Sequence, residues 1–276
     1  MATATDTNMA KAFPVTHQRG FGTVAITTFI FLYAPLAVAL VFAFNAGTSP
    51  AKWGGFSLRW FQSAANNQQV ISASILSLKL AAISATLSTT LATLAALAMS
   101  RTPRFRGWTL AYSAISFPLM VPEIVTAVAL LVVTATFRGW TGYSGLGYLV
   151  LAHTAFCVPF AYLPIRARLQ TMDISLERAA GDLYASPWNA FRFVTMPLLF
   201  PGILAGFILA FVTSLDDVVI TEFVKTAGQD TLPTYMLGQV RRTITPEVNA
   251  IAAVFLLISV ALVMCIYVVN QRTKIN

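Results

Sequence analysis

Six runs of mostly apolar residues, each close to the length that crosses a lipid bilayer, constrain this chain more than any other feature of its sequence. A membrane-spanning helix needs about 20 consecutive apolar residues, because the hydrocarbon layer is about 30 Å thick and a helix rises about 1.5 Å per residue. We therefore expect six transmembrane helices. They are predicted at residues 23–44, 71–99, 110–137, 146–165, 198–220 and 248–269.

The composition agrees with a chain that lies mostly in lipid. Of the 276 residues, 57% are hydrophobic and only 10% are charged, whereas soluble domains carry about 25% charged residues. The prediction is an all-α integral membrane protein with a single transmembrane domain over residues 23–269, an N-terminal tail over residues 1–22 and a C-terminal tail over residues 270–276. The first run is too long for the apolar core of a signal peptide and is interpreted as a retained signal anchor.

Neither the net charge nor the cysteines point to a nucleic-acid or metal site. The formal net charge is +8, but the basic residues are distributed among the connectors between the runs instead of forming one patch. Cys157 and Cys265 both fall inside apolar runs without disulfide or metal-ligand spacing, and are interpreted as packing residues. We expect no metal and no nucleic-acid partner.

The distribution of basic residues predicts the orientation of the chain in the membrane. The connectors on one side carry eleven Lys and Arg residues and those on the other side carry six, with Lys79 near the start of the second run. Because Lys and Arg accumulate on the cytoplasmic side, both termini and the connector between the fourth and fifth runs are expected in the cytoplasm.

That connector is more polar and more helix-forming than a simple link requires, and from Ser175 it reads SLERAAGDLYASPWNAFRFVTMPLLFPGILAG. Ser175 suits a helix N-cap, and Glu177 suits the positively polarised first turn. Ser186 followed by Pro187 repeats this start signal, and Pro197 is expected to end the second helix. The pattern predicts two short helices that dock against a partner; the alternative is an amphipathic loop on the membrane surface.

Four segments of the sequence resemble a known family. Two of these segments resemble the coupling-loop signature of permease subunits of ATP-binding-cassette importers, namely LERAAGDLYAS and VTMPLLFPGILAG. Two more narrow the resemblance to spermidine/putrescine-type permeases, namely SLDDVVITEFV and TLPTYMLGQVRRTITPEVNAIA. The resemblance extends from about Tyr33 to Val260. It implies that the connector fits a groove on a cytoplasmic ATPase subunit.

The resemblance implies a transporter subunit and not an enzyme. The partners it implies are a homologous second permease subunit in a heterodimer, two copies of a cytoplasmic ATPase and a periplasmic substrate-binding protein, all at the bacterial inner membrane. The chain contains no phosphate-binding motif GxxxxGK[ST], so ATP and Mg²⁺ are expected in the ATPase and no cofactor in this chain. A nucleophile–base pair is also missing, because His17 lies in the tail and His153 is alone within the fourth run.

The signature departs from the family pattern at two positions. Arg178 stands where the family has the Glu of its Glu-Ala-Ala triplet, and Tyr184 stands where it has a Gly that permits a tight turn. Two interpretations of Tyr184 remain open: it contacts the ATPase directly, or the turn is built around Asp182 and Ala185. The coupling loop is expected over residues 168–197. Its expected ATPase-contacting residues are Glu177, Arg178, Ala179, Ala180, Gly181, Asp182, Tyr184 and Phe191.

Carboxylates in apolar surroundings are candidates for the substrate pathway, because burying a charge in lipid is costly. Glu123 follows Pro118 and Pro122, which are expected to break the third helix and free carbonyl groups towards a cavity. Carboxylates with aromatic companions suit a cationic amine through ion pairing and cation–π contact. The expected pathway residues are Glu123, Asp216, Asp217, Glu222 and Tyr235.

Some of these residues also have a structural interpretation. Asp217 is equally suited to cap a helix or to pair with Arg241 or Arg242, and Glu222 is suited to lie in external water. The Arg241–Arg242 pair is expected either to meet acidic groups on a substrate-binding protein or to be solvated.

The preferred function is therefore a permease for putrescine or spermidine, driven by a separate ATPase. Another small amine, an amino acid or a similar solute is the alternative within the same class, because the resemblance implies that selectivity resides largely in the binding protein. A secondary carrier driven by an ion gradient is the alternative of another class, and a channel is a weaker one. Six runs without an internal repeat, and the structured connector, argue against the carrier.

Overall fold

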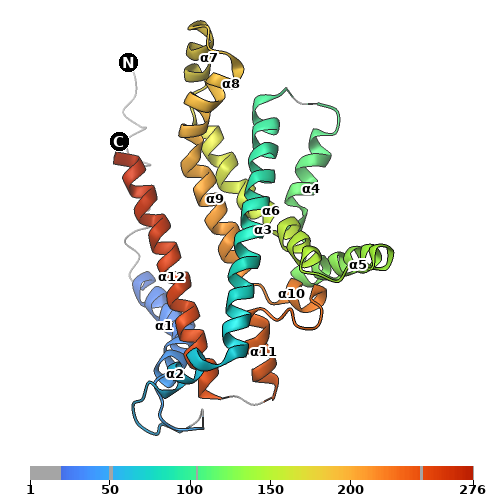
Figure 1. The fold of residues 1–276 in the computed structure, drawn as a ribbon. Helices are drawn as coiled ribbons and strands as arrows, with labels where there is room; N and C mark the ends of the chain where they lie inside the picture. Colours follow the sequence, from blue (N-terminus) through green and yellow to red (C-terminus); the bar gives the residue numbers. More distant parts are fainter. Residues whose placement is uncertain (1–19, 50–51, 104, 243–244, 276) are drawn as a thin grey trace.

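The computed structural model describes residues 20–49, 52–103, 105–242 and 245–275, with no side chain described at residues 262 and 265–275 (Figure 1). This part of the chain is helical, and its one β-type contact is an isolated bridge between Asn45 and Phe56. The helices are α1 (Phe21–Phe42), α2 (Arg59–Asn66), α3 (Gln68–Arg101), α4 (Trp108–Met120), α5 (Glu123–Thr141), α6 (Gly147–Thr171), α7 (Ser175–Asp182), α8 (Pro187–Ala190), the π-helical turn η3 (Phe191–Thr195), α9 (Met196–Asp216), α10 (Val219–Val224), α11 (Leu232–Arg242) and α12 (Pro246–Ile275).

Five helices within the described residues are long and apolar enough to cross a membrane. They are α1, α3, α5, α6 and the continuous helix Pro187–Asp216. The sixth expected span falls on α12, whose described apolar part is Pro246–Ala261. Most of the predicted N-terminal tail and the side chain of Cys265 lie outside the described residues, whereas α12 continues through most of the predicted C-terminal tail.

The third apolar run was expected to form one span interrupted by prolines, and the structure divides it into two helices. α4 ends at Met120, and α5 begins at Glu123 after an extended Pro122 with φ −52° and ψ 133°. Figure 1 shows α4 and α5 running in different directions from this break. The predicted helix break is thus confirmed, but residues 110–137 do not form a single straight helix. Pro122 lacks the N–H that would continue the helical hydrogen bonds.

The centre of the molecule consists of α3, α6 and α9, which pack along one another. The buried face of α3 is made almost entirely of Ala, Ser and Thr, so neighbouring helices approach its backbone closely. Two glycines in α9 do the same: a Cβ at Gly206 would lie 2.7 Å from the carbonyl oxygen of Ala161, and one at Gly202 would lie 2.6 Å from Cβ of Arg168. Small side chains therefore set the spacing of these three helices.

The second short helix of the connector between α6 and α9 does not end at Pro197, as its sequence suggested. α8, η3 and α9 form one continuous helix, so the prediction that Pro197 ends the second short helix is wrong. The N–H of Met196 donates to the carbonyl group of Phe191, five residues earlier, which is the hydrogen bond of a π-turn. Pro197 is the second residue of α9 and follows directly after the π-turn, where the regular hydrogen-bond pattern is already displaced.

The two ends of the bundle differ in what they carry. Figure 1 shows α7 and α8 together at one end, whereas α2, α10 and α11 lie towards the other. α3 extends between these two regions as an uninterrupted helix.

Candidate functional site

The tip of the connector is a tight turn at the end of α7, built on Tyr184. Its φ is +59°, and among the described residues it is the one non-glycine residue with a positive φ. The N–H of Tyr184 donates to the carbonyl group of Gly181 at 2.9 Å, and that of Ala185 donates to the carbonyl group of Ala180 at 3.0 Å. These two bonds define a Schellman motif, which normally has Gly in the left-handed position. Tyr184 therefore adopts the glycine conformation itself.

Side-chain caps begin both short helices, but one is not the residue expected. The predicted cap Ser175 is wrong: the carboxylate of Asp173 accepts the N–H of Ser175 at 2.8 Å instead. Hydrogen bonds from the side chain and backbone of Ser175 lower the pKa of Asp173. At the second helix the prediction is confirmed, because Oγ of Ser186 accepts the N–H of Asn189 at 3.3 Å and Pro187 is the first helical residue.

Most of the expected ATPase-contacting residues lie on an exposed surface at this tip. Arg178, Ala179, Gly181 and Asp182 are exposed, and Tyr184 is 98% exposed. Two apolar neighbours outside the expected set extend this surface, Leu183 at 81% and Trp188 at 64% exposure. We call these seven residues the tip surface: Arg178, Ala179, Gly181, Asp182, Leu183, Tyr184 and Trp188.

Glu177 differs from the tip surface because its carboxylate faces its own chain. Its Oε1 lies 2.7 Å from a guanidinium nitrogen of Arg101, and it accepts a hydrogen bond from the hydroxyl group of Thr195 at 3.1 Å. The side chains of Arg101 and Glu177 are each 23% exposed. Glu177 therefore joins three elements: α7, the last residue of α3 and the last residue of η3.

A second feature is a cavity of about 440 Å³ that brings together three of the expected pathway carboxylates. Glu123 comes from the first turn of α5, and Asp216 and Asp217 come from the end of α9. Phe156 and Phe160 of α6 line the same cavity, with ring centroids 5.3 Å apart. We call this space the carboxylate cavity.

Within the carboxylate cavity, Asp217 has a clear structural role. Its oxygens accept the N–H of Ile220 at 3.1 Å, the N–H of Thr221 at 2.8 Å and the hydroxyl group of Thr221 at 2.8 Å. These bonds satisfy backbone N–H groups in the first turn of α10, which have no partner within the helix. The capping alternative for Asp217 is thus confirmed. Pairing of Asp217 with Arg241 or Arg242 is not found among the described residues.

His153 completes this arrangement and was missed by the sequence analysis, which treated it as an isolated residue. The imidazole is fully buried, with Nδ1 2.8 Å from the hydroxyl oxygen of Ser214 and Nε2 3.0 Å from that of Thr221. Nε2 also lies 3.5 Å from the Asp217 carboxylate. The partners come from helices distant in sequence, so no spacing pattern could have revealed them.

Asp216 contrasts with its neighbour because it has no cationic partner within ion-pair distance in the described part of the chain. An unpaired carboxylate beside two aromatic rings is suited to an organic ammonium group, which ion pairing and cation–π contact both stabilise.

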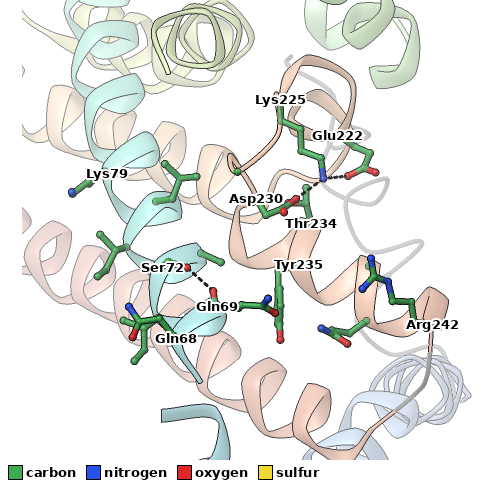
Figure 2. A pocket seen from close by; sticks show the side chains of 17 residues that line it. Gln68, Gln69, Ser72, Lys79, Glu222, Lys225, Asp230, Thr234, Tyr235 and Arg242 are labelled. Carbon is green, nitrogen blue, oxygen red and sulfur yellow. Dashed lines mark hydrogen bonds and ion pairs between the residues drawn. The ribbon is translucent and has the colours of Figure 1, made fainter. Parts of the chain in front are cut away.

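The remaining two pathway residues, Glu222 and Tyr235, line a separate cavity of about 790 Å³ between α3, α11 and the segment that joins α10 to α11. Figure 2 shows Lys225 between the carboxylates of Glu222 and Asp230, at 2.6 and 2.7 Å. Arg241 is a second partner of Glu222, at 3.6 Å. We call this space the outer cavity.

The charges of the outer cavity are therefore partly neutralised within the chain. Burial favours the neutral form of Lys225, but hydrogen bonds to Asp230 and Glu222 outweigh that effect and raise its pKa. Tyr235 accepts a hydrogen bond from the side-chain amide of Asn67 at 3.3 Å. The structure thus divides the five expected pathway residues between two cavities, and it leaves Glu222 less available to a substrate than Asp216.

Comparison with known proteins gives a consistent result. Residues 88–275 match the family described as binding-protein-dependent transport system inner membrane component. The chain is 38% identical to the putrescine transport system permease protein PotI of Escherichia coli (strain K12) over 84% of each chain. It is 33% identical to the spermidine/putrescine transport system permease protein PotC of the same strain, over 90% of this chain and 93% of PotC.

A solved structure shares the fold at lower sequence identity. A bacterial ATP-binding-cassette transporter involved in import of the acidic polysaccharide alginate superposes with a TM-score of 0.66 at 17% identity, over 91% of this chain and 92% of the other. At this identity the likeness concerns the fold alone.

Proposed function

This chain belongs to the family of binding-protein-dependent transport system inner membrane components, and from that premise we propose that it is the permease subunit of an ATP-binding-cassette importer for putrescine or spermidine. Two relatives whose names state these substrates cover most of its length. The chain is a transporter subunit and not an enzyme, and ATP with Mg²⁺ binds in the partner ATPase.

The observation that supports a cationic substrate most directly is the carboxylate cavity. Its aromatic pair, Phe156 and Phe160, and its carboxylates, Glu123 and Asp216, suit the primary ammonium groups of a polyamine. A bound ammonium group would replace its water contacts with one ion pair and one aromatic face. A bound ammonium group would also reduce the repulsion among the carboxylates of Glu123, Asp216 and Asp217, which line one cavity.

The tip surface is the proposed contact with the ATPase. Exposed Leu183, Tyr184 and Trp188 provide the apolar and aromatic area that protein interfaces favour at their centre. Phe191 supports Trp188 from within the same helix, with ring centroids 5.7 Å apart. Ala179, Ala180 and Gly181 leave room for close approach of a partner, whereas Glu177 acts by positioning α7 and not through the exposed tip.

The complete transporter would contain a homologous second permease subunit, two ATPase copies and a periplasmic substrate-binding protein. We place the coupling loop, residues 168–197, and both termini in the cytoplasm of a bacterial cell, with α12 as the sixth span. The outer cavity then faces the binding protein, which Arg241 and Arg242 would attract through acidic groups on its surface. An importer for another small amine or for an amino acid is the alternative that keeps this architecture.

The test is uptake of labelled putrescine and spermidine into proteoliposomes that contain the complete complex. We expect uptake that requires both ATP and the binding protein. Uptake driven by an ion gradient in the absence of the ATPase would refute the importer in favour of a secondary carrier. ATP-dependent uptake of a different solute, with neither polyamine transported, would support the ATP-driven importer but contradict polyamines as its substrates.

A further inference from the structure

One helix connects the coupling loop with the outer cavity without interruption. α3 contains 34 residues and ends at Arg101, so it extends about 50 Å at about 1.5 Å per residue. Its sequence contains neither Pro nor Gly. Sharp kinks in helices occur mostly at Pro, at Gly/Ser pairs or at π-turns, and α3 has none of these. Its Ser74, Thr86, Thr90 and Thr93 hydroxyl groups donate to carbonyl groups four residues earlier, an arrangement that favours a gentle bend. α3 is therefore suited to move as one continuous element.

The other two central helices are interrupted. α6 contains Pro159 and Pro164, and α9 contains Pro201 and begins immediately after the π-turn η3. Helices bend most readily at prolines and at π-turns. A movement of the connector is therefore transmitted more completely along α3 than along α6 or α9.

At the connector end, the charged contact of α3 is made by its last residue, Arg101. Arg101 binds Glu177 of α7 at 2.7 Å, and Glu177 is also bound by Thr195 of η3. The three side chains line one cavity of about 380 Å³ together with Phe191. Because Glu177 and Thr195 lie on opposite sides of the tip turn, Glu177 joins the two arms of the coupling loop, and Arg101 holds this junction against the end of α3.

At the other end, α3 is attached to the elements around the outer cavity. The buried hydroxyl oxygen of Ser77 accepts the N–H of Leu232, the first residue of α11, at 2.7 Å. Asn67, the residue before α3, donates to Tyr235 of α11 at 3.3 Å and to Glu247 of α12 at 3.2 Å. α3 and α11 also form two walls of the outer cavity (Figure 2). Movement of α3 would therefore move α11 with it.

We propose that Arg101 is a positioning residue that fixes the coupling loop to α3, so that displacement of the loop by the ATPase is transmitted along α3 to the outer cavity. The inference rests on the proposed importer function and assigns a specific path within it. Arg101 does not touch substrate or nucleotide. Its role is to make α7, η3 and α3 one rigid body, the kind of element that carries a transition between two states.

The test measures ATP hydrolysis and polyamine uptake in the same proteoliposomes, with the complete complex. In Arg101→Gln we expect the ATPase to assemble and hydrolyse ATP, while uptake per ATP hydrolysed falls about five-fold or more, the range typical of a lost coupling. Glu177→Gln should have the same effect, and the double variant should be no worse than either single one. Arg106→Gln is the matched control: this exposed arginine has no ion-pair partner within the described residues and should leave uptake per ATP unchanged.

The charge-reversed pair Arg101→Glu with Glu177→Arg separates transmission from simple loss of folding. Restored uptake per ATP in the double variant would support the proposal, even if each single variant assembles poorly. If Arg101→Gln assembles with wild-type uptake per ATP, or the assembled reversed pair recovers none, the proposal is overturned. A wild-type complex without ATP-dependent polyamine uptake would instead contradict the proposed function, so the two failures are distinguishable.

Discussion

Nε2 of His153 lies 3.5 Å from Oδ2 of Asp217, and neither side chain is more than 1% exposed. This contact connects α6 with the turn between α9 and α10, and Asp217 is held in place by three hydrogen bonds from Ile220 and Thr221. Removal of a group that satisfies buried donors leaves those donors unpaired, which costs about 1–3 kcal/mol for each buried group.

We therefore predict that Asp217→Ala lowers the free energy of unfolding by about 2–4 kcal/mol, whereas Asp216→Ala changes it by less than about 0.5 kcal/mol. The two residues are adjacent, so the pair separates a capping carboxylate from a solvent-accessible one. The measurement is the thermal unfolding midpoint of the detergent-solubilised permease. Equal midpoints for the two variants would contradict the capping role of Asp217.

Tyr184 gives a prediction about backbone strain. A side-chain residue in the left-handed region costs about 1–2 kcal/mol, so Tyr184→Gly should stabilise the end of α7 by about 0.5–1 kcal/mol, and Tyr184→Ala should not. Hydrogen exchange of the segment after Ala180 measures this in the isolated permease. If Tyr184 also contacts the ATPase, both variants weaken its association, and unchanged association would remove Tyr184 from the proposed interface.

The carboxylates of the two cavities should differ in their effect on transport. Asp216→Asn and Glu123→Gln are expected to lower polyamine uptake about ten-fold or more each, since a charge-assisted hydrogen bond contributes about 1.5–3 kcal/mol. Glu222→Gln is the comparison, because Lys225 and Arg241 already pair with Glu222. Concentration-dependent uptake of labelled putrescine is the measurement. A larger loss in Glu222→Gln than in Asp216→Asn would place the recognition of substrate charge in the outer cavity instead.

The aromatic pair of the carboxylate cavity supports a further prediction. Phe160→Leu should lower uptake about two- to thirty-fold, because a cation–π contact contributes about 0.5–2 kcal/mol, while Phe160→Tyr should retain it. Both substitutions preserve a large apolar group, so the protein should still fold. Equal uptake by the two variants would show that volume alone matters at this wall of the cavity.

The start of α7 should depend on pH. Hydrogen bonds from Ser175 lower the pKa of Asp173 below its usual value of 3.8. A lowered pKa in the folded state means that the cap contributes fully above pH 3.8 and is lost as the pH falls through the folded-state pKa. The protection factors of the amides in the first turn of α7, which correct for the intrinsic pH dependence of hydrogen exchange, should therefore fall in acid in the wild type. Asp173→Asn should show no such fall, and the same acid response in that variant would exclude Asp173 as its origin.

Apolar length and proline positions were enough to locate the long helices and the break before Glu123, because both effects act within about 20 residues of sequence. The helix start at Pro187 was predictable for the same reason. The continuous passage from α8 into α9 was not, since a π-turn has no composition that distinguishes it from an ordinary helix end at a proline.

The site was predictable in its residue types more than in its contacts. Glu123, Asp216, Asp217, Glu222 and Tyr235 were expected along one pathway, and the fold brings the first three together in one cavity while the other two line another. The partners of His153 and Glu177 could not be derived, because they lie 61 or more residues away for His153 and 76 residues away for the Arg101 pair. Contacts of that kind depend on how α3, α6 and α9 pack. Small side chains allow these helices to pack in several registers, so the sequence alone does not specify the contacts.

The π-turn at Phe191–Thr195 absorbs one residue more than a regular helix would hold between the coupling loop and α9. Each residue of an α-helix turns the chain by about 100°, and a π-turn accommodates about one residue more than the regular helix. Deletion of one residue within this turn would therefore restore a regular helix and leave Trp188 and the tip facing as they do, whereas the same deletion in the regular helix of α9 would rotate them by more than a quarter of a circle about the helix axis. The turn is thus a place where the chain can change its length by one residue while both the direction of the tip and the transmembrane packing stay intact.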